Sequence, residues 1–142
     1  MKNSREMLSS VLKTAQLGQS GIRSVLDTSM RPALRKALEA QLRELDAIES
    51  EACAIATQRG WELSELDPGG RFLSDMMTRI RLSHGNCDSR IAGMMIRGNT
   101  KRMIKGYQDL HQYPRQDDRI SSICQKLIDC ETANIRQMQS FL

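Results

Sequence analysis

The sequence predicts an all-α protein, an antiparallel four-helix bundle. Three observations predict the helical class. Only 4% of the 142 residues are aromatic and only three are proline, while helix-favouring Leu, Met, Ala, Gln, Arg and Glu recur. Apolar residues return at steps of three and four along most of the chain. The stretches that interrupt this pattern are loop-sized, so we expect one domain over residues 1–142.

The first two predicted helices cover the N-terminal part of the chain. The apolar stripe that begins at Leu8 predicts a helix over about residues 4–27. The second helix starts near Pro32, because a proline in the first turn removes an N–H group that has no helical partner there. It ends at Gly60, which suits the left-handed position that follows many helices. We expect Trp61 to pack back over this helix end.

The third and fourth predicted helices follow the longest connection, WELSELDPGG (61–70). The third helix opens at Asp67-Pro68 and continues to about Leu110. Its sequence contains SHGN, whose Ser, Gly and Asn weaken a helix, so we expect a kink or break near residues 83–87. The fourth helix follows QYPRQDD, and Asp118 suits the positive end of its dipole.

Three segments resemble a group of bacterial ferritin-like four-helix proteins of unassigned function, found mainly in Gram-positive bacteria. They are LKTAQLGQSGIRSVL (12–26), DSRIAGMMIRGNTKRMI (88–104) and LIDCETANIRQMQSFL (127–142). The resemblance implies a bundle in which one connection runs the length of the molecule, and WELSELDPGG is the candidate. It also implies missing ligands, because relatives tend to have His-Ile-Ala-Glu where this chain has RIAG (90–93).

The glutamates do not form a di-metal motif. Such a centre takes one Glu from each of two helices and Glu-x-x-His from the other two, because positions i and i+3 share a helix face. No glutamate of the chain precedes a histidine at this spacing, and Glu131 precedes Asn134 instead. We therefore predict no metal centre, no cofactor and no catalytic residue.

Glu131 is still expected on the apolar face of the last helix, which leaves two interpretations. In one, Glu131 and Glu49 or Glu44 hold a lone cation. In the other, which we favour, Glu131 is a buried acid held by an arginine of a neighbouring helix, by Gln19 or by water, because an isolated buried carboxylate is costly.

The third helix carries a basic surface that is a candidate for binding an anion or a partner. Arg97, Lys101 and Lys105 follow one another at four-residue steps, and Arg102 adds a further cation. The plainer interpretation is a solvated face that complements the acids of the second helix, Glu39 to Glu51. Nucleic-acid binding through this surface is an alternative that we do not favour, because no aromatic residues interleave with the cations.

The remaining features predict a non-catalytic interaction or structural module in the cytoplasm. No apolar run reaches the ~20 residues of a membrane span, and no signal peptide is recognisable. The four cysteines form no CxxC pair and are expected as reduced thiols in the core or at its boundary. Two methionine pairs, Met76-Met77 and Met94-Met95, favour a core role. One member of each pair is expected to face a protein partner, such as a second copy, or to lie under the long connection. The opposing interpretation is a metal-dependent oxidoreductase or metal-binding protein with a reduced ligand set.

Overall fold

The described residues of the computed structural model, 4–63, 87–112 and 118–142, form four α-helices and no strand. The helices are α1 (Ser4–Leu26), α2 (Pro32–Arg59), α4 (Cys87–Gln112) and α5 (Asp118–Gln139). The all-α prediction is confirmed, and the predicted bounds of the first two helices differ by at most one residue. The predicted first half of the third helix and nearly all of its predicted kink at 83–87 lie outside the described residues.

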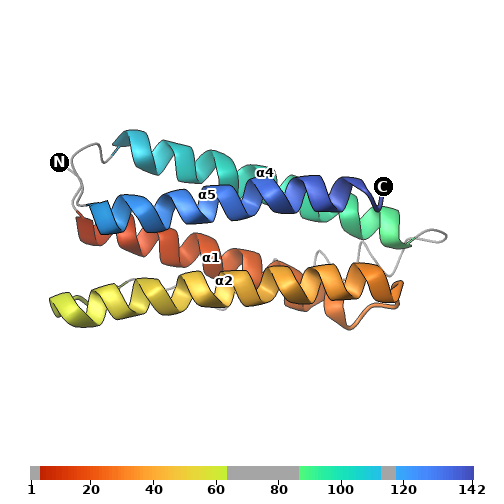
Figure 1. Cartoon of the computed structure of the whole chain (residues 1–142), viewed down its shortest axis with the longest axis horizontal. Helices are drawn as coiled ribbons and strands as arrows, with labels where there is room; N and C mark the ends of the chain where they lie inside the picture. The colour runs from red at the N-terminus through yellow and green to blue at the C-terminus, as the bar shows by residue number, and fades with distance from the viewer. Residues whose placement is uncertain (1–3, 64–86, 113–117) are drawn as a thin grey trace.

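The four helices pack side by side as a bundle (Figure 1). Helix α1 contacts α2, α4 and α5, and α5 also contacts α2 and α4. Helices α1 and α5 run in one direction and α2 and α4 in the other, so α1 is antiparallel to α2 and α4, and α5 likewise. Helix α2 ends at the end of the bundle opposite to the one where α4 begins.

The C-terminal end of α2 matches the prediction in detail. Gly60 has φ 66° and ψ 30°, a left-handed conformation that glycine adopts without a Cβ clash. The N–H of Gly60 donates to the Thr57 carbonyl at 3.2 Å, and that of Trp61 donates to the Ala56 carbonyl at 2.9 Å. Trp61 packs against the core, with the Arg59 guanidinium 5.1 Å from its ring centroid.

The core is a layer of aliphatic side chains from all four helices. Its largest fully buried members include Leu12, Leu38, Ile91 and Leu127. In the one methionine pair that the structure describes, Met95 is buried and Met94 is partly exposed, as expected for adjacent positions on a helix.

Helices α4 and α5 approach closely at Gly106. A Cβ atom built on Gly106 would lie 2.6 Å from Ile128 Cγ1, closer than real contacts allow. Glycine is therefore needed here for packing. Among the helices that the structure describes, none is long and apolar enough to cross a membrane.

Candidate functional site

A buried ion pair joins α4 to α5. Nε of Arg102 donates to Oε1 of Glu131 at 2.9 Å, and the two side chains are 8% and 0% exposed. The predicted burial of Glu131 is confirmed, and of its three expected partners the structure shows an arginine from the neighbouring helix. Hydrogen bonding and opposite charge together make this a strong type of interaction, although desolvation of both groups opposes it.

The Arg102 guanidinium lies where the helices converge. Its Nη2 donates to Oδ1 of Asn99, one turn earlier in α4, at 2.6 Å. On the other side Gly18 of α1 leaves room for it, because a Cβ there would lie 3.1 Å from Arg102 Nε and 2.8 Å from Leu45 Cδ1 of α2. The positive charge thus occupies the interior beside α1, α2 and α5.

The pair leaves polar atoms that the described residues do not satisfy. Oε2 of Glu131 and Nδ2 of Asn99 are buried without a hydrogen-bond partner among these residues. Burial raises the pKa of Glu131, and the charge and hydrogen bond of Arg102 oppose that rise. Because the folded pKa is raised above the ordinary value of 4.5, the stability that Glu131 confers is fully present below pH 4.5. This stability is lost as the pH rises through the folded pKa.

Replacing Glu131 with glutamine should therefore have a pH-dependent effect. The nearly isosteric amide cannot ionise, so relative to the wild type the Glu131→Gln variant should gain stability between pH 4 and pH 7. Urea unfolding at both pH values measures this difference. Glutamine also leaves the buried Arg102 cation without its counter-charge, which lowers stability at both pH values. A difference that moves in favour of the wild type from pH 4 to pH 7 would contradict the raised pKa of Glu131.

Glu49 does not share the surroundings of Glu131. Its carboxylate accepts hydrogen bonds from Nε2 of Gln16 at 3.1 Å and of Gln19 at 3.4 Å, across the α1–α2 interface. Gln19 also donates to Oδ1 of Asp46 at 2.8 Å. Gln19, predicted as a possible partner of Glu131, therefore donates to acids of α2 instead. Among the described residues, no group of three or more His, Cys, Asp or Glu side chains could hold a metal ion.

The acids of α2 also pair with α5. Nζ of Lys126 lies 3.0 Å from Oε2 of Glu51, and the Cys130 thiol donates to Oε2 of Glu44 at 3.1 Å. The expectation that these acids complement the basic third helix is therefore wrong for the ion pairs seen here. The physical reason is the order of helices around the bundle, which places α2 against α1 and α5.

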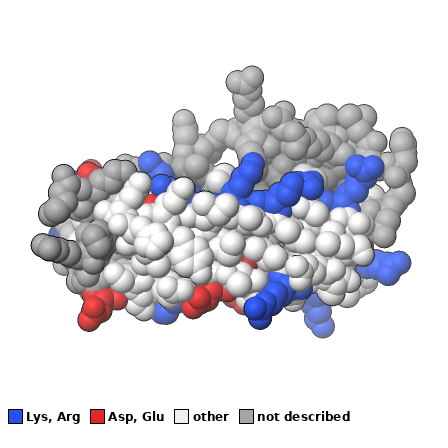
Figure 2. Space-filling view, turned by 90° about the horizontal axis from the view of Figure 1, so that it is seen from above, with Lys and Arg blue, Asp and Glu red and all other residues white. Residues whose placement is uncertain are grey.

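The basic stripe of α4 is partly confirmed and partly corrected. Arg97, Lys101 and Lys105 are all exposed. Figure 2 shows cationic side chains in a row along one border of the face formed by α4 and α5. Arg102, which we predicted as part of this surface, is buried instead. One residue advances a helix by about 100°, which turns Arg102 away from Lys101 and into the core.

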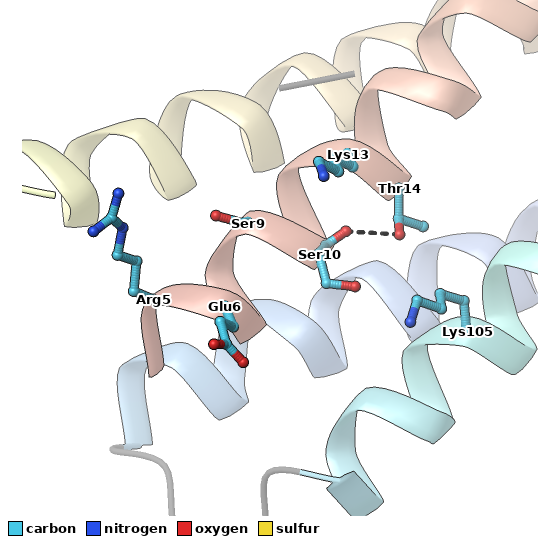
Figure 3. A pocket seen from close by; sticks show the side chains of 7 residues that line it. All are labelled: Arg5, Glu6, Ser9, Ser10, Lys13, Thr14 and Lys105. Atoms are coloured by element: carbon cyan, nitrogen blue, oxygen red, sulfur yellow. Dashed lines mark hydrogen bonds between the residues drawn. The ribbon is translucent and has the colours of Figure 1, made fainter. Parts of the chain in front are cut away.

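A cavity of about 540 Å³ lies between α1 and α4 (Figure 3). Its α1 wall consists of Arg5, Glu6, Ser9, Ser10, Lys13 and Thr14. Lys105 lines it from α4. Of the residues that line this cavity, the sequence indicated only Lys105, as part of the basic stripe of the third helix. The pattern within one helix does not show which residues of another helix lie opposite. The signal for the α1 side was SSVLKT (9–14), where hydroxyls and a lysine share a face by the helical period.

None of the four cysteines is in a disulfide bond, and their surroundings differ. Burial, with the nearby charge of Asp109, raises the pKa of Cys124 to about 12, and burial and Glu44 raise the pKa of Cys130. These two thiols are unreactive by this criterion, since the thiolate is the nucleophile. Cys87 is half-buried, as predicted for a boundary thiol. Cys53 is exposed, so its predicted place in the core or boundary is wrong.

In comparisons with known proteins, no protein-family model, no curated protein and no solved structure matches the chain.

Proposed function

We propose that the chain is a non-catalytic, ferritin-like bundle that acts as an interaction or structural module and uses no metal. The topology supports the ferritin-like part of this proposal. Helices α2 and α4 run in the same direction, and α2 ends opposite to the start of α4. A bundle with one long connection between its second and third helices has this arrangement.

The Arg102–Glu131 pair is the observation that carries the metal-free part. A carboxylate in a bundle core needs a compensating positive charge, and a metal ion is one source of it. Here the Arg102 guanidinium supplies that charge at 2.9 Å from Oε1 of Glu131. The same cation would repel a metal ion at Glu131, the interior carboxylate that the di-metal pattern makes a candidate ligand.

Metal analysis tests this proposal. Protein purified without chelator and incubated with Fe²⁺ or Mn²⁺ should retain no stoichiometric metal after desalting. Glu131→Ala is the informative variant, and Glu6→Ala, at an exposed glutamate of α1, is its matched control. Near-unit occupancy that disappears in Glu131→Ala and persists in Glu6→Ala would refute the metal-free proposal in favour of the metal-binding alternative.

The interaction role is supported by an uncharged face of α4 and α5. Ile104 and Tyr107 of α4 are 49% and 45% exposed, and Figure 2 shows a broad surface without charged side chains beside the cationic row. We propose that a second copy of the chain covers this face. The two copies would be related by a two-fold axis that lies in the interface and runs parallel to the helices. The α5 edge of the second copy would then lie over the α4 edge of the first.

Charge supports this arrangement of the two copies. Asp129 of α5 is exposed and lies within about one turn of the level of Lys101, because the neighbouring Arg102 contacts Glu131. The basic edge of one copy would therefore face a carboxylate of the other. Sedimentation velocity should give a dimer that Ile104→Asp converts to a monomer, while Ala54→Asp, on the exposed face of α2, leaves it intact. A monomeric wild type, or a dimeric Ile104→Asp, would refute this interface.

A further inference from the structure

We propose that the α1–α4 cavity binds a small phosphorylated molecule that also carries hydroxyl groups. This site is separate from the core ion pair and from the uncharged face. The first argument is the register of the two helices. Oγ of Ser10 donates to Oδ2 of Asp109 at 2.6 Å, and the helices are antiparallel. Lys13 and Lys105 each lie about one turn from that bond in the same direction, so they lie at similar levels on opposite sides of the cavity.

The two lysines differ in how they are held. Nζ of Lys105 lies 3.2 Å from Oδ1 of Asp109. The Asp109 side chain is only 2% exposed, so it holds the Lys105 ammonium from the interior side. Lys105 itself is 48% exposed and keeps further N–H groups for a ligand. Lys13 is exposed and forms no hydrogen bond or ion pair with the described residues. One ammonium is thus oriented in advance and the other is available.

A phosphate group matches this pair of cations. A phosphate monoester carries close to two negative charges at neutral pH, and lysine is a common phosphate-binding residue. The guanidinium of Arg5 adds positive charge at the end of the cavity, although its Nε already donates to the Glu62 carbonyl at 2.9 Å. Figure 3 shows Arg5 directed away from Ser10, so the two lysines are the principal phosphate ligands.

The rest of the cavity wall favours a ligand with hydroxyl groups. The Ser10 hydroxyl donates its proton to Asp109 at 2.6 Å, and the Thr14 hydroxyl donates its proton to the Ser10 carbonyl at 2.8 Å. Their oxygens can therefore only accept hydrogen bonds from a ligand, and the Glu6 carboxylate, also in the wall, is an acceptor too. Acceptors beside two cations fit a molecule with hydroxyls beside its phosphate. The volume, about 540 Å³, lies in the usual range of small-molecule sites.

A titration followed by ¹H–¹⁵N NMR at low ionic strength tests the site, with glucose 6-phosphate as the probe. We expect saturable shifts of the Ser9, Ser10 and Lys13 amides. Lys13→Gln should raise the Kd about tenfold, because it removes one charge-assisted contact. Lys101→Gln is the matched control, an exposed lysine of α4 outside the cavity, and should leave the Kd unchanged.

Two further probes test the assigned ligand class. Inorganic phosphate should bind more weakly than glucose 6-phosphate, and glucose alone should not bind. Equal Kd values for the two phosphates would overturn the role of the hydroxyl groups. The site itself would be overturned by an absence of saturable shifts, or by an equal loss of affinity in Lys13→Gln and Lys101→Gln.

Discussion

Arg102→Met is expected to lower the free energy of unfolding by about 3 kcal/mol at pH 7. Methionine fills a similar volume but leaves the carboxylate of Glu131, which is fully buried, without a positive charge. The folded protein must then either keep an isolated buried charge or protonate Glu131. The cost of protonating Glu131 sets the upper limit of the loss in stability. This cost falls as the pH approaches the ordinary pKa of 4.5.

Denaturant unfolding monitored by circular dichroism measures this loss. The loss should be much smaller at pH 4.5 than at pH 7. The double variant Arg102→Met/Glu131→Leu should recover to within ~1 kcal/mol of the wild type at pH 7, because it removes both charges and keeps the volume. Arg97→Met, at an exposed position of the same helix, is the control and should change stability little. A double variant as unstable as Arg102→Met alone would contradict this account.

Gly106→Val should be similarly destabilising, by about 3 kcal/mol, for a steric reason. The new Cβ would lie 2.6 Å from Ile128 Cγ1 and 3.2 Å from Ile128 Cδ1. Ile128 is a β-branched residue in a packed core, so it cannot move aside without shifting α5 against α4. A reduced midpoint in thermal and denaturant unfolding would measure the effect.

Gly93→Ala is the matched comparison on the same helix. A Cβ on Gly93 would meet Arg97 Nη1 at 3.7 Å and Leu142 Cδ2 at 4.0 Å, which are ordinary contacts. The higher helix propensity of alanine should then raise stability by about 0.5–1 kcal/mol. If Gly106→Val were as stable as the wild type, the close approach of α4 and α5 would be wrong.

The helices were largely predictable because local signals define them. The apolar period located α1, α2 and α5, and Pro32 and Gly60 marked the bounds of α2 to within one residue. Periodicity shows which face of a helix is buried, but not which helix lies against it. For this reason the acids of α2 were assigned to the wrong neighbour.

The core ion pair was only half predictable. Glu131 stood out as an acid on an apolar stripe, and this pattern alone predicted its burial. Arg102 was grouped with the neighbouring exposed cations, although its position about 100° from Lys101 places it on the core side. Its long side chain needs space inside the bundle. Gly18 provides that space from a helix far away in the sequence, and the spacing of residues within one helix cannot show such a contact.

The most direct test of the interior ion pair is hydrogen exchange at the side-chain Nε–H of Arg102, resolved by ¹H–¹⁵N NMR. Because this group is buried and donates to Glu131 at 2.9 Å, it should exchange at least ~100-fold more slowly than the Nε–H of exposed Arg97. The protection should be lost in Glu131→Ala. Exchange of Arg102 as fast as that of Arg97 in the wild type would contradict a bundle core whose carboxylate is neutralised by arginine.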